Sequence, residues 1–240
     1  MRIIFASPHV VGRPPGCLAT IREVTAIRRE SALTVTGARV ELGGNLVLDG
    51  VDLSAATGEA VAIMGDNGVG KSTLLRGLAG LQRLDSGEID VLGGGAPSDD
   101  AAFWGEVVLV ADEPGWYPGL TVEEHLGLVQ AVYGATRMTA ADALAAFHLR
   151  ARADVAPLNL STGQRQRLSL AMALLRPSRL LLLDEPERGL DAGFRPRLGE
   201  ILREYTAAGG TVVMATHDPR LAEAAAARLV RLAEGRAVAR

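Results

Sequence analysis

The sequence predicts an α/β protein whose mostly parallel sheet carries helices on both faces. Four short apolar runs, at 59–64, 107–110, 180–183 and 211–215, predict buried strands, and segments of helical character separate them. A glycine-rich loop follows the first run, and two acids follow the third. Since parallel sheets bind ligands at the carboxyl ends of their strands, these polar groups predict a site at that edge.

The N-terminal third is predicted to form a small antiparallel β layer. Residues 32–35 and 39–42 predict strands, and a glycine-containing turn at 43–45 leads into further β structure at 46–53. Later in the chain, Thr121 with Glu124 three residues on has the pattern of a capping box that opens a helix. The expected helical segments are 72–81, 121–150 with a second helix at 139–148, 163–175, 194–207 and 219–228, and a hairpin at 229–238 is expected to close the chain.

Composition excludes several kinds of site and partner. The net charge of −3 disfavours a polyanion as the main partner, so no nucleic acid is expected. Cys17 is the only cysteine, which excludes an intramolecular disulfide and a cysteine metal site and favours a reducing compartment. The histidines show no metal-ligand spacing.

The protein is expected to be cytoplasmic. No apolar stretch reaches the roughly 20 residues of a membrane span, and the first 16 residues lack the apolar centre of a signal peptide. Residues 1–31 are rich in proline and glycine at their start and are expected to form a poorly ordered extension, with a short charged helix at 20–30 as one possibility. The alternative is upstream sequence outside the native start.

The segment 65–73 matches the phosphate-loop pattern G-x-x-x-x-G-K-[ST]. Its glycines let backbone N–H groups cradle phosphate oxygens, Lys71 supplies charge to the β- and γ-phosphates, and the Ser72 hydroxyl ligates Mg²⁺. The alternative is an accidental glycine-rich turn, which the strand before the loop and the helix after it argue against. The predicted phosphate-binding residues are Gly65, Asp66, Asn67, Gly68, Val69, Gly70, Lys71, Ser72 and Thr73.

A strand that ends in two acids predicts the other half of this site. Four leucines at 180–183 precede Asp184 and Glu185. Asp184 is predicted to hold the Mg²⁺ that Ser72 also ligates, and Glu185 to orient or polarise an attacking water. The alternative is a strand that ends in a polar turn stopped by Pro186.

The segment 160–167 reads Leu-Ser-Thr-Gly-Gln-Arg-Gln-Arg and precedes a predicted helix. With the phosphate loop, it resembles the LSGGQ signature of the nucleotide-binding domains of ATP-binding-cassette (ABC) proteins, with Thr162 in place of one glycine. The resemblance covers about 32–240. It implies an ATPase of the P-loop NTPase fold with a helical subdomain at about 113–165. The alternative is an ordinary helix cap by Ser161 or Thr162.

The resemblance implies an ATP site shared by two copies of the chain, which dimerise head to tail. Each ATP would lie between the phosphate loop of one copy and the signature of the other, because a helix N-terminus suits an anion. The D-loop, whose end matches 189–191, would contact the partner copy. The signature residues implied to reach the partner's γ-phosphate are Ser161, Gly163 and Gln164.

His217 follows the strand at 211–215, where the family carries its switch histidine. The resemblance implies that His217 contacts the γ-phosphate and holds Glu185 and water in place; the alternative is a structural histidine. Where the family usually has glutamine, this chain has Asp112, which is implied to sense Mg²⁺ or the water with a shorter reach. Its neighbour Glu113 is the other candidate for that role.

Two further departures from the family pattern affect the base and the rate. Leu42 stands where an aromatic residue stacks on adenine, which implies apolar contact in place of stacking, or adenine held elsewhere. Arg188 in the D-loop and Thr162 in the signature add bulk, and are expected to slow hydrolysis. Lys71 remains among the implied catalytic residues.

The resemblance also implies a transport function. ATP binding would close a homodimer, closure would drive a transmembrane permease, and the chain would lie at the inner face of the cell membrane only through that permease. The segment 113–165 is the implied docking region for the permease. Within it, Trp116 and Tyr117 either face the partner or pack locally. The stretch 116–126 resembles that of exporter-type transport ATPases. Two alternatives stay open: a soluble ABC ATPase that acts as a mechanical clamp, and a regulatory ATP-binding subunit with little turnover.

Overall fold

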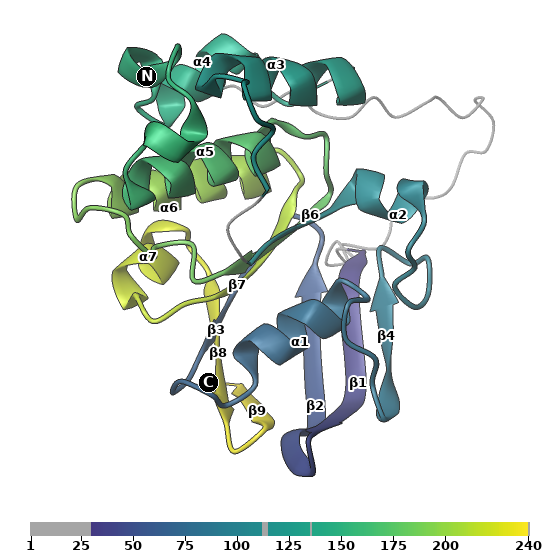
Figure 1. Cartoon of the computed structure of the whole chain (residues 1–240). Helices are drawn as coiled ribbons and strands as arrows, with labels where there is room; N and C mark the ends of the chain where they lie inside the picture. The colour runs from purple at the N-terminus through teal and green to yellow at the C-terminus, as the bar shows by residue number, and fades with distance from the viewer. Residues whose placement is uncertain (1–29, 112–114, 135, 240) are drawn as a thin grey trace, which may run out of the picture.

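The computed structural model describes residues 30–111, 115–134 and 136–239. Its largest element is a six-stranded sheet in the order β5-β6-β7-β3-β8-β9, in which the first five strands are parallel and β9 is antiparallel to β8 (Figure 1). Residues 1–29 of the predicted extension, Asp112 and Glu113 lie outside the described residues, and the predicted end of the extension at 31 is wrong because Ser31 already belongs to β1. The strands are β3 (Ala60–Met64), β5 (Val107–Val110), β6 (Leu180–Asp184), β7 (Thr211–Ala215), β8 (Arg228–Ala233) and β9 (Arg236–Ala239).

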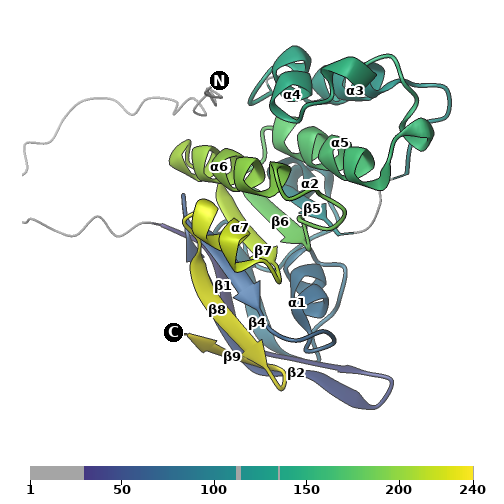
Figure 2. The ribbon, with the colours of Figure 1, turned by 90° about the vertical axis from the view of Figure 1, so that its left-hand side faces the viewer.

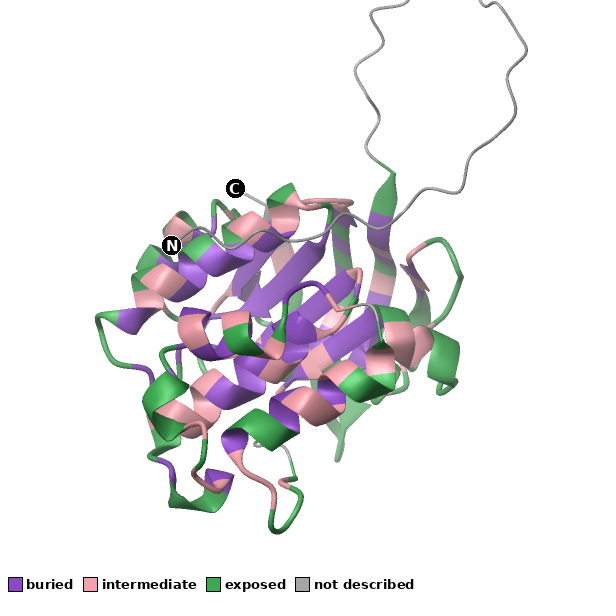
Figure 3. Cartoon of the chain, turned by 90° about the horizontal axis from the view of Figure 1, so that it is seen from above, coloured by how far each residue is buried: buried purple, intermediate pink, exposed green. Residues whose placement is uncertain are grey.

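Alternation along each central strand builds two hydrophobic cores, one on each face of the sheet. In β6, Leu181 and Leu183 belong to one core while Leu180 and Leu182 belong to the other, and β3 and β7 divide in the same way. A strand that is buried on both faces reads as a continuous apolar run, which explains why the sequence alone revealed these strands. Figure 3 shows the buried strands in the middle of the molecule and exposed residues around them.

The second core lies between the large sheet and a three-stranded antiparallel sheet, with α1 (Lys71–Leu78) sandwiched between them (Figure 1). The small sheet has the order β2-β1-β4 and consists of β1 (Ser31–Leu42), β2 (Asn45–Ala56) and β4 (Ser86–Val91). The predicted strands at 32–35 and 39–42 are wrong as separate elements, because β1 runs through both. The pairing register shifts between Val35 and Arg39, at a left-handed Gly37, which explains the apparent break. No sequence pattern predicted β4.

The first core is covered by the remaining helices. Figure 1 shows α3, α4 and α5 together at one end, with α6 and α7 beside them. The predicted capping box is present, since Thr121 N donates to Glu124 Oε2 over 2.7 Å and Glu124 N donates to Thr121 Oγ1 over 3.3 Å. These helices are α3 (Val122–Tyr133), α4 (Ala140–Ala146), α5 (Thr162–Leu175), α6 (Phe194–Ala207) and α7 (Pro219–Ala224), joined by 3₁₀ turns at Arg150–Arg152 and Pro157–Asn159; the unpredicted α2 (Ala101–Glu106) leads into β5.

Two predicted helices extend too far. α1 ends at Leu78 and not at 81, because Gly80 takes a left-handed backbone with a φ of 75° that turns the chain toward β4. α7 ends at Ala224 and not at 228, since Arg228 begins β8 and pairs with Val61 of β3. An alanine-rich run favours a helix locally, but the pairing of β8 with the central strand β3 ends the helix before Arg228.

The two sheets also meet at the C-terminal hairpin. Asp49 N of β2 donates to Gly235 O in the β8–β9 turn over 2.8 Å, and the Asp49 carboxylate forms an ion pair with Arg236 at 2.8 Å. Figure 2 shows β9 and the β1–β2 hairpin at the same, lower end of the molecule. The predicted closing hairpin is therefore confirmed, and it fixes the small sheet next to the phosphate loop.

Candidate nucleotide site

The loop 65–70 connects the end of β3 to the start of α1, as the pattern predicted. A methyl group on Gly65 would lie 2.2 Å from Leu232 O, and one on Gly70 would lie 2.7 Å from a methyl carbon of Leu48. Gly70 also has a φ of 104°, which L side chains rarely adopt. The fold therefore requires glycine at both ends of this loop. Its tip is exposed, at Asp66, Asn67 and Gly68.

The Lys71 side chain folds back along the loop. It is only 6% exposed, and its ammonium donates to Gly65 O and to Asp66 O, both over 2.8 Å. The loop carbonyls thus hold the charge inside the loop, where backbone N–H groups of a phosphate loop gather around phosphate oxygens. The lysine is positioned for an anion.

Asp184 ends β6 beside the start of α1. Burial raises the pKa of Asp184 above its ordinary value, and a hydrogen bond with the Ser72 side chain acts in the opposite direction. The Asp184 Oδ1 atom is buried and has no hydrogen-bond partner among the residues that the structure describes. Ser72 is 112 residues away in sequence, so the sheet alone brings this pair together.

These two oxygen groups fit Mg²⁺. Mg²⁺ takes hard oxygen ligands, and commonly binds through one or two carboxylates while phosphates and waters complete its shell. An unpaired buried carboxylate oxygen next to a serine hydroxyl offers that partial set. Within the described ranges, no three His, Cys, Asp or Glu side chains gather into an all-protein metal site. The geometry therefore suits a cation that arrives with a phosphate ligand.

Glu185 has a strained backbone at the sheet edge. Its φ is 48°, in the left-handed region that side chains with a Cβ avoid. Glu185 N donates to Ala215 O at the end of β7 over 2.9 Å. This turn directs the carboxylate to the next strand end, where Glu185 Oε1 lies 3.4 Å from His217 Nε2. Both side chains are partly exposed, at 38% and 41%, so a ligand can reach them.

A buried acid that no sequence motif indicated, Glu187, holds the loop of His217. Glu187 is buried, and its Oε1 atom accepts hydrogen bonds from Thr216 Oγ1 over 2.6 Å and from His217 N over 2.9 Å. The only signal in the sequence was a third acid in the run 184–187. The contact joins two loops that are 30 residues apart, which no local pattern reveals.

The signature segment forms the N-terminus of α5. Ser161 is the N-cap residue: Gln164 N donates to Ser161 Oγ over 3.2 Å, and Ser161 N donates to Gln164 Oε1 over 3.0 Å. The helix-cap alternative is thus present in the structure, and it leaves the site role of these residues open. A methyl group on Gly163 would lie 2.5 Å from Gly189 O, so the signature and the D-loop touch through their backbones.

The structure brings the signature to the D-loop and not to the phosphate loop of the same chain. Arg167 on α5 pairs with Asp191, and Gln166 Nε2 donates to Pro186 O over 3.2 Å. Within the described part of the chain, no hydrogen bond joins 161–164 to 65–73. Among the described residues, the polar contacts of the signature helix thus run to the D-loop side and none joins the two predicted halves of the ATP site.

The two aromatic residues of the predicted docking region differ in their surroundings. Trp116 packs partly buried against the first core and against the His125 ring, with 5.7 Å between ring centroids. Tyr117 is 59% exposed, while its backbone N–H donates to His125 Nε2 over 3.0 Å. Trp116 thus packs locally, whereas most of the Tyr117 side chain is open to solvent.

Leu42 ends β1 opposite Asn45 and is 42% exposed. The same hairpin reaches the phosphate loop, because a methyl group on Gly70 would lie 2.9 Å from Val47 O. Leu42 is therefore an open apolar side chain on an element that borders the phosphate loop.

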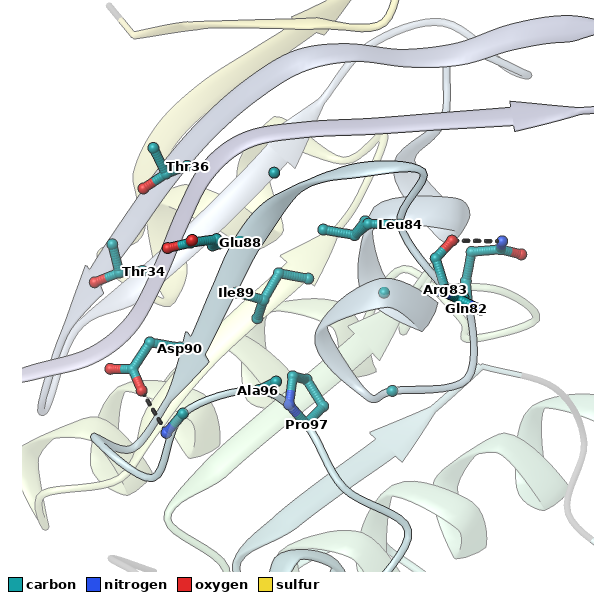
Figure 4. A pocket seen from close by; sticks show the side chains of 14 residues that line it. Thr34, Thr36, Gln82, Arg83, Leu84, Glu88, Ile89, Asp90, Ala96 and Pro97 are labelled. Carbon is teal, nitrogen blue, oxygen red and sulfur yellow. Dashed lines mark hydrogen bonds between the residues drawn. The ribbon is translucent and has the colours of Figure 1, made fainter.

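A large cavity lies away from these residues. It measures about 590 Å³ and is found at the C-terminal end of α1, between β1, β4 and the segment 95–97 (Figure 4). Thr34, Ile89 and Pro97 line it, and none of the predicted site residues does. The candidate site is at the opposite end of α1, on the open edge of the sheet.

Comparison with known proteins identifies the family. Residues 48–188 match the sequence model of the ABC transporter family. The chain is 35% identical over 215 residues to the cytochrome c biogenesis ATP-binding export protein CcmA of Gluconobacter oxydans, covering 90% of this chain and 86% of that one. It is 40% identical over 208 residues to the aliphatic sulfonates import ATP-binding protein SsuB of Pseudomonas putida, covering 86% and 75%.

Solved structures with a similar fold are also ATP-binding subunits or cassettes. An ATP-binding subunit of an ABC transporter superposes with a TM-score of 0.75 at 29% identity, covering 86% of this chain and 88% of that one. A dimeric ATP-binding cassette in a post-hydrolysis state, bound to ADP and Pi, gives a TM-score of 0.73 at 26% identity, covering 85% and 96%.

The chain belongs to the ABC transporter family, and it is an ATP-binding, ATP-hydrolysing subunit of that family. The predicted α/β fold, with its antiparallel β layer, and the predicted ATPase class are confirmed. One of these relatives is named an export protein and the other an import protein, so the comparisons do not separate the expected exporter type from an importer type. None of the helices in the described ranges combines the length and the apolar character needed to cross a membrane.

Proposed function

We propose that two copies of this chain bind two Mg²⁺·ATP between them and couple their closure to a membrane permease. The observation that carries the proposal is the convergence of Lys71, Asp184, Glu185 and His217, from three separate segments, at one edge of the sheet. The lack of a hydrogen bond between the signature and the phosphate loop, within the described part of one copy, supports a site that a second copy completes. Dimeric assembly of a similar solved cassette supports it too.

The proposed chemistry follows from the positions of the side chains. Lys71 and the loop N–H groups hold the phosphates and stabilise the charge that develops on the transferring phosphoryl group. Asp184 and Ser72 would hold Mg²⁺, which supplies charge neutralisation when bound. Glu185 orients the attacking water, and His217 at 3.4 Å keeps that carboxylate in place and faces the γ-phosphate.

From the other copy, Ser161, Gly163 and Gln164 contribute the N-terminus of a 14-residue helix toward the γ-phosphate. Leu42 contributes apolar contact to the adenine. The proposed ATP-binding domain spans 32–240, and residues 1–31 precede it.

The proposed docking region for the permease is the helical part at about 113–165. A cavity of about 310 Å³ between β5, α3 and α5 supports this assignment, because exposed Tyr117 and Val132 line it, at 59% and 67% exposure. Apolar side chains that gather around a cavity are a common sign of a protein interface. The occupant that we propose is a segment of a permease, which would hold the chain at the inner face of the cell membrane.

The variant Glu185→Gln tests the proposal. It should lower the turnover of ATP by at least about 100-fold, while the Kd for ATP stays within about threefold, since the amide keeps the shape but not the base. An equally low turnover in both proteins would instead favour a regulatory ATP-binding subunit. Native pull-downs from membranes should recover a multi-span membrane protein with the wild-type chain, and recovery of none would favour the soluble clamp.

A further inference from the structure

Glu187 is a buried acid between the predicted base and the D-loop. It is 8% exposed, although its neighbours Glu185 and Arg188 are more accessible. Burying a carboxylate costs free energy unless hydrogen bonds compensate. Its Oε1 atom receives two such bonds, and its Oε2 atom is buried with no partner among the described residues. The position therefore carries a polar group that is only half compensated.

Both hydrogen bonds of Glu187 end on the loop of His217. Thr216 is fully buried, and its hydroxyl donates to Glu187 Oε1 over 2.6 Å and accepts from Asp218 N over 3.0 Å. The His217 N–H donates to the same carboxylate oxygen over 2.9 Å. Glu187 Oε1 thus holds the backbone before the His217 Cα directly, and it holds the backbone after that Cα through the Thr216 hydroxyl.

The other end of this contact is anchored to the loop of Glu185. Arg188 N donates to Glu185 O over 2.9 Å, and Leu190 N donates to Glu187 O over 3.0 Å, so 185–190 forms one tight turn. Glu187 projects from that turn to Thr216 and His217. The separation of 3.4 Å between Glu185 Oε1 and His217 Nε2 therefore depends on two tethers between the loops, the backbone bond from Glu185 N to Ala215 O and the Glu187 carboxylate.

We propose that Glu187 is a positioning residue for hydrolysis, which holds His217 in register with Glu185. It acts through the backbone of His217 and through Thr216, and does not touch the nucleotide. The proposal rests on the proposed function, because it assigns His217 a role in turnover. A brace that only stabilises the fold would affect unfolding but not the relation between these two side chains.

Kinetics on the full chain separate these roles. Glu187→Ala removes the accepting oxygen and should lower kcat about tenfold with little change in the KM for ATP, whereas Glu187→Gln keeps an accepting oxygen and should recover most of kcat. In a His217→Ala background, Glu187→Ala should cause no further loss, because the group that it positions is gone. The matched control is Glu59→Gln, which alters another carboxylate that accepts from a backbone N–H but lies just before β3, at the other end of the central sheet, and it should leave kcat unchanged.

A measurement at His217 itself tests the proposal without catalysis. With ¹⁵N-labelled histidine at fixed pH, Glu187→Ala and Glu187→Gln should shift the ring signals of His217, more strongly for alanine, and leave those of buried His125 unchanged. An unchanged His217 signal, or kcat losses that multiply in the double variant, would overturn the proposal. If His217→Ala alone leaves kcat unchanged, the proposed role of His217 fails, and the His217 signal still decides whether Glu187 positions it.

Discussion

Glu185 Oε1 lies 3.4 Å from His217 Nε2, although 32 positions separate the two residues and each follows a different strand. The contact exists because β6 and β7 are adjacent parallel strands whose carboxyl ends meet at one edge, with Asp184 paired to Ala215. The left-handed backbone of Glu185 then turns its side chain toward the histidine. A strained residue at a strand end is typical of sites where position matters more than local stability.

Replacing Lys71 by alanine should weaken ATP binding by more than about tenfold, because the phosphates lose a charge-assisted partner. The measurement is calorimetric titration of ATP into the wild type and Lys71→Ala. Arg83→Ala is the matched control, since Arg83 is an exposed cation beyond the far end of α1. Equal affinity in the wild type and Lys71→Ala would contradict the assignment of the phosphate loop.

Replacing Asp184 by asparagine should stabilise the nucleotide-free chain at neutral pH. Burial raises the pKa of Asp184 in the folded state, so its contribution to stability is present at low pH and is lost as pH rises through that folded pKa. In thermal unfolding without Mg²⁺, the melting temperature of Asp184→Asn should therefore rise relative to that of the wild type as the pH increases from the acid range. A difference that shrinks with rising pH would contradict this linkage.

The same variant should lose the effect of Mg²⁺ on nucleotide affinity. Asp184 Oδ1 is the buried oxygen without a partner, and asparagine offers no negative charge to the cation. Titrations of ATP with Mg²⁺ and with EDTA should differ in the wild type and coincide in Asp184→Asn. A full Mg²⁺ effect in the variant would place the metal ligand elsewhere.

Replacing Gly163 by alanine should separate ATP binding from association of two copies. The new methyl group would lie 2.5 Å from Gly189 O, so the signature or the D-loop must move. Hydrolysis should fall at least about tenfold, because the composite geometry is lost, while ATP still binds the phosphate loop of each copy. The prediction fails if turnover is unchanged.

Gly127→Ala is the control for that substitution. Gly127 lies inside α3, where a methyl group would meet nothing within 4 Å. Alanine should raise stability there by about 0.5–1 kcal/mol through helix propensity and leave ATPase activity unchanged.

Replacing Leu42 by alanine should lower the affinity for ATP about threefold to tenfold but leave the affinity for tripolyphosphate unchanged. The substitution removes part of the apolar contact between Leu42 and the base of ATP. Tripolyphosphate has no base, so its affinity does not depend on this contact. Leu229→Ala is the matched control, because Leu229 is also 42% exposed and lies on β8. Equal losses for both ligands would mean that Leu42 does not contact the base.

Local patterns predicted the strands and loops whose causes are local. The leucines of β6, the glycines at Gly65 and Gly70, and the capping box of Thr121 each have a signature within a few residues. The contact of Ser72 with Asp184 could be expected because both follow central strands of a parallel sheet.

What the sequence did not predict depends on tertiary pairing. β4 is short and exposed along half its length, and it exists because β1 offers it an edge, with Leu33 opposite Val91. The end of α7 is set by the pairing of β8 with β3. Glu187 was missed for the same reason, because its partners Thr216 and His217 come from another loop.

Two copies of the chain should associate when ATP is bound, because a second copy is proposed to complete each ATP site. The most direct measurement is the mass of Glu185→Gln in solution by light scattering, with Mg²⁺·ATP and without nucleotide. We expect the mass of one chain without nucleotide and the mass of two chains with Mg²⁺·ATP. Adding Gly163→Ala to this variant should return the mass to that of one chain. A mass of one chain at saturating Mg²⁺·ATP would contradict it.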